Sequence, residues 1–497
     1  MYDKDNDDIP LDLTALAKEA MLEKGMLPDF SLQVWQELKK IEKMPLIPAD
    51  FNALDMRSLL WFSLDNDTSK DLDQLTFAKK LKDKDDKYVI YIAVALVDML
   101  VKKGGAIDAH AAQNTVSIYA PTKMFPMLPE KLSTDLTSLN ENEERLALIF
   151  EAEIDNDGLI LSGRPYVAIV HNKAQLAYNS VSDWLDGKAA APLKIQQVPG
   201  LDAQIKLQDQ ISSLLENARH QSGALSLETI EPHIVLIDGK PVEIKKESKN
   251  RGKELIENFM IVANTISARY ADTNKLLSLR RVVTIPERWD KIVEIAAEKG
   301  VNLPKTPNAK ALQLFLALQK KKDPDSFPDL SLTIVKLLGR GKYTVIAPNG
   351  NSGENSSIHF GLGLQNYSHS TAPNRRFPDL LTQRILLSSL YKQRLPYSKE
   401  ELQSLATHCT KAQEVADKIE RRLKKCAQAL VISKHIGDEF DAIVTGAGNK
   451  GTWVRTFSPP VEGKIIKGEG GLDVGDKIRV KLISTNPRAG HIDFIKD

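Results

Sequence analysis

The chain has 497 residues, of which 42% are hydrophobic and 27% charged, an ordinary composition for a globular protein of two to four domains. Lys and Arg number 67 against 66 Asp and Glu, so no overall positive field indicates a nucleic-acid-binding protein. Cys409 and Cys426 offer neither a disulfide framework nor a zinc spacing, which fits a reducing cytosol. The acidic N-terminus lacks an apolar signal core, and the longest apolar run, 88–97, is too short for a membrane span. We therefore expect a cytoplasmic protein with no membrane partner.

Residues 1–49 are expected to form a short tail and a small helical region. Helical spacing of leucines and alanines over 11–20 predicts a first helix, which Gly25 would end. Ser31 is the candidate N-cap of a second helix.

From residue 50 the pattern becomes strand-like, with one long amphipathic helix predicted over 203–222 and ended by Gly223. Strands are predicted over 88–101, 115–121, 146–154, 167–171, 224–237 and 242–245. From Gly252 helices predominate, over 255–266, 287–299, 308–321, 329–338, 378–391 and 398–433. Between residues 375 and 434 there are 13 Lys and Arg against 6 Asp and Glu. A solvated helix face explains part of this excess, and a groove for a polyanion would also use it.

Residues 436–497 form a separate unit of five short strands punctuated by glycines. The strands are predicted over 440–445, 452–457, 464–467, 477–484 and 491–495. This size and pattern predict a small OB-type barrel.

Four carboxylates crowd into the stretch between residues 63 and 74. Asp65, Asp67, Asp71 and Asp73 repel one another unless a cation lies among them, and Mg²⁺ prefers such oxygen ligands. In extended backbone Asp71 and Asp73 face the same side while Leu72 points away. Asp65 could fold back to meet them, and metals held this way assist phosphodiester cleavage.

This stretch has two other interpretations. The first is a plain acidic surface turn. The second is a calcium-binding loop, which requires Gly at its sixth position and Glu at its twelfth. Those positions are Lys70 and Thr76, so the calcium loop is rejected.

A second polar cluster lies between Tyr367 and Asp379. Its adjacent guanidiniums, Arg375 and Arg376, precede a predicted helix N-terminus. Arginine offers a planar fork that matches phosphate, and helix N-termini add N–H donors. A surface Arg pair bound to acids is the alternative.

The acidic stretch resembles the catalytic signature of the ribonuclease II (RNB) family of exoribonucleases. The resemblance runs in the family's order from about residue 55 to 430. Its further blocks are 114–121, 126–133, 176–178, 255–260, 360–364 and 370–379. The C-terminal unit resembles the S-one-type RNA-binding OB barrel that ends many members.

The resemblance implies an α+β fold in three parts. A helical region would cover 1–49, and an RNB catalytic domain, a mixed sheet surrounded by helices, would cover 50–434. An OB barrel would cover 435–497. The implied activity is hydrolytic 3′→5′ degradation of single-stranded RNA to nucleoside 5′-monophosphates, with Mg²⁺ or Mn²⁺, by a monomer.

The resemblance also implies roles for individual residues. Asp65, Asp71 and Asp73 would be the catalytic and metal-binding carboxylates, and Arg375 would steady the scissile phosphate. The implied RNA-binding residues are Tyr119, Tyr178, Glu257, Arg376 and Glu420. Single-stranded RNA is usually held by stacking and backbone contacts, which suits this set.

The sequence departs from the family pattern at several positions. Gln74 stands where a fourth Asp is usual; its amide can still be a metal ligand but adds no charge, and Asp67 is the candidate to compensate. Leu227 replaces the second aromatic of a base clamp, a loss of roughly 1–3 kcal/mol per stacked base. Gln113 stands where Arg is common, and the usual N-terminal cold-shock barrels are absent.

Three functional interpretations follow. An active Mg²⁺-dependent exoribonuclease is favoured by the retained carboxylates. A non-catalytic RNA-binding or regulatory relative is favoured by Gln74. An unrelated Mg²⁺ phosphohydrolase acting on small substrates is disfavoured by the C-terminal barrel.

Overall fold

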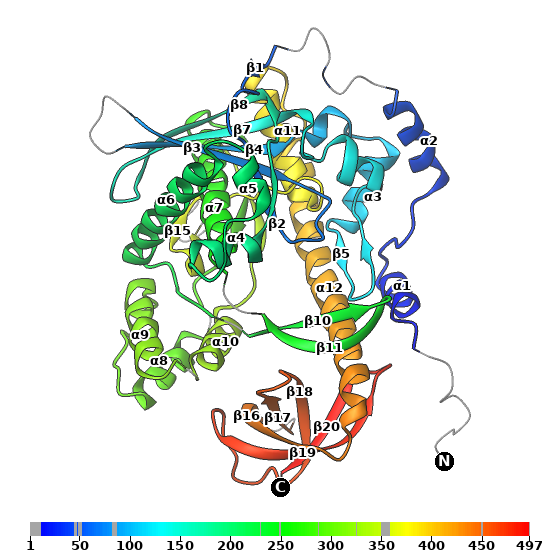
Figure 1. Ribbon diagram of the computed structural model, residues 1–497, viewed down its shortest axis with the longest axis vertical. Helices are drawn as coiled ribbons and strands as arrows, with labels where there is room; N and C mark the ends of the chain where they lie inside the picture. The colour runs from blue at the N-terminus through cyan, green and yellow to red at the C-terminus, as the bar shows by residue number, and fades with distance from the viewer. Residues whose placement is uncertain are drawn as a thin grey trace.

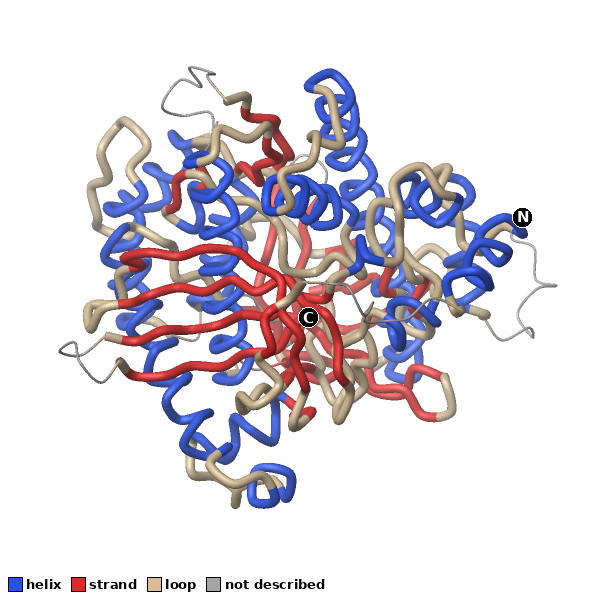
Figure 2. Tube along the Cα trace, turned by 90° about the horizontal axis from the view of Figure 1, so that it is seen from above, coloured by secondary structure: helices blue, strands red, loops and turns tan. Residues whose placement is uncertain are grey.

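The structure is a computed structural model that describes residues 11–43, 47, 52–81, 87–228, 230–247, 250–286, 288–324, 326–348, 358–448 and 451–496. Its centre is a five-stranded sheet in the order β1-β8-β7-β4-β3. The strands are β1 (Leu54–Asp55), β3 (Gln74–Lys80), β4 (Tyr88–Ala95), β7 (Glu144–Ile154) and β8 (Ile160–His171). Figure 2 shows the long strands side by side with helices behind them. The described part of the chain contains no helix that is both long and apolar enough to cross a membrane.

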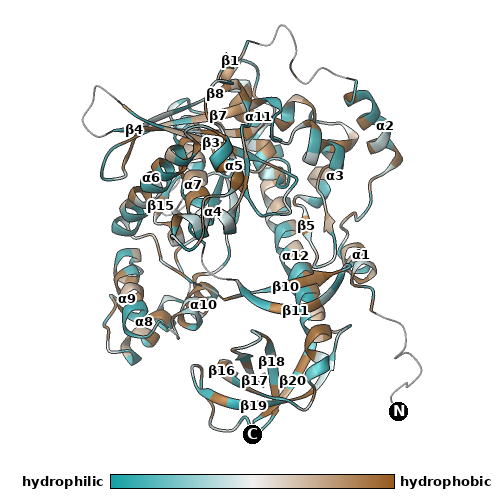
Figure 3. Cartoon of the chain, in the orientation of Figure 1, coloured by the Kyte–Doolittle hydropathy of each residue, from teal (hydrophilic) through white to brown (hydrophobic). Residues whose placement is uncertain are grey.

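Strand β4 is buried along its whole length because both faces of the sheet are covered. Alternate residues point to opposite faces: Val89, Tyr91 and Ala93 enter one apolar cluster, whereas Ile90 and Ile92 enter another. The second cluster includes α6 (Leu201–Ser222) and α7 (Arg251–Thr273). In Figure 3 α6 carries long hydrophilic stretches, as expected for a helix with one solvated face.

Three strand predictions were partly wrong. The predicted strand 88–101 ends at Ala95 and continues as a 3₁₀ turn, Val97–Met99, because the Asp98 carboxylate turns to bind the buried Arg384 at 2.8 Å. Only Ile118–Tyr119 (β5) forms a strand within 115–121. The strand predicted from residue 224 begins at Glu231 (β10, Glu231–Ile237).

A backbone angle and a hydrogen bond explain the last two differences. Thr115 has a φ of 64°, which breaks extended backbone before β5. The Leu225 N–H is donated to the Gly361 carbonyl at 2.9 Å, so this segment pairs with another loop before β10 begins. Strand β11 (Lys240–Glu247) then completes a two-stranded ribbon.

The predicted helices are present, although α7 extends beyond the predicted 255–266 at both ends. Three helices between residues 106 and 197 were missed, because this part of the chain was interpreted as strand-like. The N-terminal pair is α1 (Leu13–Glu23) and α2 (Leu32–Ile41), and the Ser31 hydroxyl caps α2 as predicted. The remaining ones include α3 (Ala106–Asn114), α4 (Tyr178–Leu185), α5 (Leu193–Gln197), α8 (Trp289–Glu298), α9 (Ala309–Lys322), α10 (Phe327–Leu338), α11 (Phe377–Leu390) and α12 (Lys399–Ile432).

Helix α12 runs from the body of the molecule to the C-terminal barrel (Figure 1). The barrel is closed in the order β16-β17-β18-β20-β19, which confirms the predicted five-stranded barrel. Its strands are β16 (Glu439–Gly448), β17 (Gly451–Thr456), β18 (Glu462–Lys467), β19 (Lys477–Asn486) and β20 (His491–Lys496).

Candidate active site

Two short parallel strands bring the first site residues together. Strand β2 (Ser63–Asp65) pairs with β9 (Gln175–Ala177), and Asp65 lies opposite Ala177. Tyr178 follows directly as the first residue of α4. Burial raises the pKa of the Tyr178 phenol, and the Asp65 carboxylate, which lies nearby because both strands end here, raises it further.

A cavity of about 240 Å³ lies at this point. Its polar walls come from segments far apart in the chain, and its apolar wall comes from Ile256 and Met260 of α7. The lining residues include Asp65, Asp71, Gln74, Tyr119, Tyr178 and Arg375. Six of the ten residues that the sequence predicted for the site therefore share one cavity.

Asp73 lies beneath this cavity and is only 1% exposed. Its carboxylate accepts hydrogen bonds from Arg375 Nε at 3.1 Å and from the Asn374 N–H at 3.3 Å. Burial raises the pKa of Asp73 to about 7; the nearby Asp71 carboxylate also raises it, and Arg375 opposes the shift. Asp73 thus fixes the guanidinium from below and leaves its outer N–H groups to the cavity.

The other two carboxylates differ in their surroundings. Burial raises the pKa of Asp71, and Asp65 raises it further, while Arg375 and the Tyr119 hydroxyl lower it. Asp65 accepts hydrogen bonds from Ser69 Oγ at 2.9 Å and from the Asn66 N–H at 2.7 Å. Two carboxylates that disfavour each other's charge at one cavity wall create a site that a cation would stabilise.

The donor set at this wall fits one divalent cation. Asp65, Asp71 and Gln74 offer two carboxylates and an amide, and Mg²⁺ commonly takes one or two carboxylates together with water and substrate phosphate oxygens. Within the described residues, however, no group of three His, Cys, Asp or Glu is arranged to hold a metal. Asp73, predicted as a further ligand, is paired with Arg375 at 3.1 Å, and its role as a metal ligand stays a prediction.

Arg376 turns away from its neighbour. Its Nη2 binds the buried Asp379 at 2.7 Å, and the same carboxylate accepts the Thr371 and Ala372 N–H groups at 2.9 Å. This network shapes the loop that presents Arg375, and RNA binding by Arg376 stays a prediction. In the sequence Asp379 marked only the end of the second polar cluster. The Asn374 N–H donor had no sequence signal, because every residue except proline carries a backbone N–H.

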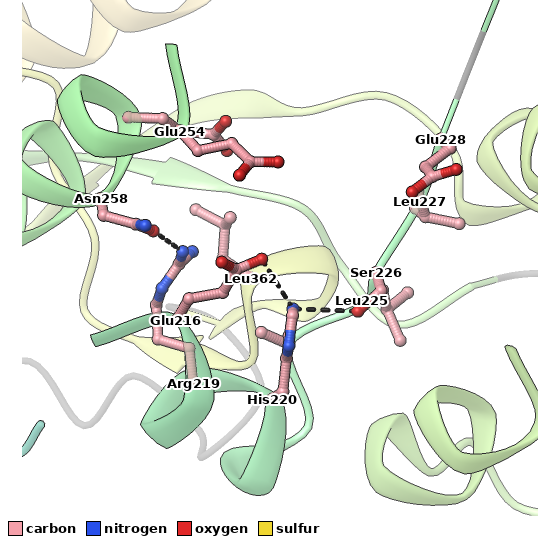
Figure 4. A pocket seen from close by; sticks show the side chains of 12 residues that line it. Glu216, Arg219, His220, Leu225, Ser226, Leu227, Glu228, Glu254, Asn258 and Leu362 are labelled. Atoms are coloured by element: carbon pink, nitrogen blue, oxygen red, sulfur yellow. Dashed lines mark hydrogen bonds and ion pairs between the residues drawn. The ribbon is translucent and has the colours of Figure 1, made fainter. Parts of the chain in front are cut away.

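Glu257 lies on a neighbouring face of α7, in a separate cavity of about 110 Å³ that Leu227 also lines. Figure 4 shows this cavity, with Arg219 and His220 of α6 and Asn258 of α7 among the residues that line it. Asp67 is exposed and lines another hollow, of about 830 Å³. Its compensation for Gln74 therefore finds no support in this geometry.

Glu420 of α12 connects the cavity to a groove. Its carboxylate accepts the Tyr119 N–H at 2.8 Å. The groove measures about 540 Å³ and mixes charges of both signs along α12. Its basic residues are Arg281, Arg340, Arg421 and Lys424.

Two parts of the chain match known protein domains. Residues 53–392 match the RNB domain. The chain belongs to the RNB family. Residues 438–496 match the RNase II-type exonuclease C-terminal S1 domain, so the closed barrel is an S1 domain beside the RNB domain.

Curated relatives are ribonucleases. The chain is 26% identical to Ribonuclease R 1 of Lactococcus lactis subsp. lactis, with 96% of this chain and 60% of the relative covered. It is 30% identical to Ribonuclease R of Mycoplasmopsis pulmonis, with 90% and 60% covered. The chain thus spans about 60% of the length of these two relatives.

Solved structures show the same fold. Mycoplasma genitalium RNase R in complex with ribose-methylated single-stranded RNA matches with a TM-score of 0.85 and 24% identity, covering 98% of this chain and 78% of that one. A yeast pseudonuclease matches with a TM-score of 0.65 and 16% identity, covering 84% and 51%. At these identities the likeness concerns the fold alone.

Proposed function

We propose that the protein is a hydrolytic 3′→5′ exoribonuclease that degrades single-stranded RNA to nucleoside 5′-monophosphates and requires Mg²⁺ or Mn²⁺. The observation that carries the proposal is the Asp73–Arg375 pair at the wall of a cavity that also receives Asp65, Asp71 and Tyr119. The RNB family and the ribonuclease names of its relatives support it. So does the fold likeness to a ribonuclease seen with single-stranded RNA.

The chain's own residues account for substrate binding. Arg375 is 45% exposed in its side chain and would bind the scissile phosphate with the N–H groups that Asp73 does not occupy. Tyr119 is 40% exposed as a residue, and its ring would stack on a base, which requires no particular sequence. Tyr178, beside Asp65, would hold the terminal nucleotide.

Hydrolysis breaks the bond between phosphorus and the 3′-oxygen of the preceding nucleotide, while the oxygen of water bonds to phosphorus. The released nucleotide keeps the phosphate on its 5′-oxygen. Asp65, Asp71 and Gln74 would hold the metal ion, which when bound activates water and offsets phosphate charge. The protein would act as a monomer on RNA.

A second candidate is an RNA-binding protein that does not cleave. Two observations favour it: Gln74 occupies the place of a carboxylate, and the described residues include no ready-made group of three metal-binding side chains. Both candidates share the same cavity, so a cleavage assay separates them.

The test uses RNA labelled at its 5′ end, incubated with the protein and with Mg²⁺, Mn²⁺ or a chelator. A ladder that shortens from the 3′ end, and only with metal, is expected. RNA that is tightly bound yet intact at every metal concentration would instead establish the second candidate.

Asp73→Asn supplies the matched control for this assay. The amide keeps the size of the side chain but removes the charge that holds Arg375, so we expect cleavage to fall roughly 10²-fold or more, with RNA affinity retained. Filter binding with the same RNA measures the affinity. Normal cleavage by Asp73→Asn would show that the site is assigned wrongly.

A further inference from the structure

The two N-terminal helices hold the segment that carries Tyr119. We call residues 11–43, which contain α1 and α2, the N-terminal arm, and residues 114–125, which contain β5 and β6 (Met124–Phe125), the Tyr119 segment. Helix α3 leads directly into the Tyr119 segment. In Figure 1 α1 lies beside α12 near β5, and α2 lies beside α3.

The N-terminal arm forms hydrogen bonds with the start of α3. The N-cap position of α3 is Gly105, which has no side chain to satisfy the first N–H groups. Glu37 of α2 takes this role, because its Oε2 accepts the N–H groups of Ala106 at 2.5 Å and Ile107 at 3.3 Å. A carboxylate at a helix N-terminus is stabilising, so α2 anchors the helix that leads to Tyr119.

The N-terminal arm also forms hydrogen bonds with the end of α3. Asn114 is 2% exposed; its Oδ1 accepts the Leu27 N–H, and its Nδ2 donates to the Leu27 carbonyl, both at 2.8 Å. Next to it, Gln113 Nε2 donates to the Gly25 carbonyl at 2.8 Å. Loss of a partner in such a buried pair leaves a polar group unsatisfied.

Helix α1 then packs against the Tyr119 segment itself. Its apolar face, formed by Leu13, Leu16 and Ala17, shares one buried cluster with Ile118 and Phe125. The cluster also includes α12 residues on both sides of Glu420. Thr14 and Thr122 join through their hydroxyls at 2.8 Å, which ties α1 to the turn between β5 and β6.

The far side of the Tyr119 segment is the active site. The Ser117 N–H is donated to the Arg375 carbonyl at 3.0 Å, and the Phe377 N–H is donated to the Thr115 carbonyl at 2.7 Å. Tyr119 follows two residues later with its own N–H on Glu420. The segment is therefore held by the arm on one side and by the backbone of Arg375 on the other.

We propose that the N-terminal arm is a positioning element for RNA: through Asn114 and α1 it fixes the Tyr119 ring at the angle needed to stack on a base at the 3′ end of the strand. This inference rests on the proposed function, because it takes Tyr119 as an RNA-stacking residue. An arm that only stabilises the fold would change thermal stability and leave stacking untouched.

The test is a double-mutant cycle in the full chain carrying Asp73→Asn, so that RNA stays intact. Asn114→Leu keeps the side chain's size and removes both bonds to Leu27, and Tyr119→Ala removes the stacking ring. Each change alone should weaken affinity for single-stranded RNA roughly tenfold. Together they should weaken it no more than Tyr119→Ala does, because the arm acts through the ring.

A 2-aminopurine base at the 3′ end of the RNA reports stacking directly. Its fluorescence should be quenched by the parent, and the quenching should be lost in Asn114→Leu. Thr14→Val, a gentler change at the same interface, should reduce quenching partly if Asn114→Leu does not fold. Glu19→Gln on α1 is the matched control, because Glu19 pairs with Arg488 of the barrel and not with the Tyr119 segment. This variant should bind RNA as tightly as the Asp73→Asn parent.

Several results would overturn the inference. Additive losses in the cycle, or unchanged quenching in folded Asn114→Leu and Thr14→Val, would show that the arm does not act through Tyr119. Tyr119→Ala that binds like the parent would overturn the stacking role and this inference together. If the unmodified chain, without Asp73→Asn, binds RNA but does not cleave it, only the exonuclease is refuted, and a non-additive cycle would still support the arm's role.

Discussion

At the scale of single residues, the proposed function makes Gln74 the position that would decide how strongly the cavity holds a cation. It is the first residue of β3, is 7% exposed and lines the cavity with Asp65 and Asp71. Cation affinity at oxygen sites follows the number of charged ligands. Asp65 and Asp71 give the cavity wall two carboxylates, and an aspartate at position 74 would make three.

We therefore expect Gln74→Asp to lower the metal concentration needed for half-maximal cleavage, roughly tenfold. The extra charge also adds repulsion when no metal is bound, so the variant's melting temperature should fall in chelator and recover with Mg²⁺. Metal titrations of cleavage and of thermal unfolding measure both effects. An unchanged metal requirement would contradict this account of position 74.

The residue scale also shows where sequence reasoning ends. Chemical type and spacing were enough to nominate Asp65, Asp71 and Arg375, and these do share a cavity. The pattern of two adjacent arginines could not show that Arg376 would bind Asp379, because the direction of each side chain is set by tertiary packing. The sequence also could not show which of the four clustered acids would be buried, and the structure shows that Asp73 lies beneath the cavity.

At the scale of elements, a strong helical repeat of apolar residues was the most reliable predictor of secondary structure. The helix predicted over 203–222 is Leu201–Ser222, since its apolar stripe and terminal Gly223 define it locally. The apolar run 88–101 was misjudged in its second half, because hydrophobicity marks burial but not the bend that brings Asp98 to Arg384. Short strands such as β5 depend on partners distant in sequence.

Helix α3 contains a titratable group within the contacts of the N-terminal arm. His110 packs against Phe30 with ring centroids 4.4 Å apart, and its Nε2 lies 3.2 Å from Asn114 Nδ2. The bonds to Leu27 fix which end of the Asn114 amide is the donor, so Nε2 must accept and the ring must be neutral. Burial accordingly lowers the pKa of His110 to about 4.

This arrangement predicts acid sensitivity. The unfolded chain protonates His110 from its ordinary value of 6.5, whereas the folded chain does so only near 4. The free energy of unfolding should therefore fall as pH drops from about 6.5 to 4, by about 3 kcal/mol from this group. Below pH 4 it should contribute no further loss.

His110→Gln isolates the effect, because glutamine can accept the same hydrogen bond and does not titrate. Urea unfolding of the two proteins should show the parent losing stability relative to the variant between pH 6.5 and 4. Equal slopes in that window would mean that His110 is already free to protonate in the folded protein.

At the scale of the whole molecule, α12 links the RNB domain to the barrel, and a buried ion pair adds a second link. Asp329, in the first turn of α10, binds Arg455 of β17 at 2.6 Å, and both side chains are under 10% exposed. Figure 1 shows α10 above the barrel. Burial raises the pKa of Asp329, and Arg455 opposes this, so the carboxylate depends on its partner across the interface.

Removing one member of this pair should lower the free energy of unfolding more than removing both members does. Arg455→Met leaves Asp329 buried without its partner and should lower the free energy of unfolding by about 3–5 kcal/mol. Asp329→Leu combined with Arg455→Met should recover most of that loss, because an apolar pair of similar volume has no charge to desolvate. The midpoints of urea unfolding measure both variants.

The exposed pair Arg479–Glu439, with side chains 63% and 40% exposed, is the matched control on the same barrel. Arg479→Met should cost only about 0.2–1 kcal/mol, since exposed ion pairs are screened by water and salt. If Arg455→Met lowered the free energy of unfolding no more than Arg479→Met does, the Asp329–Arg455 pair would not contribute to holding the barrel. A large loss in Arg455→Met but not in Arg479→Met would show that this buried ion pair couples α10 to the S1 domain.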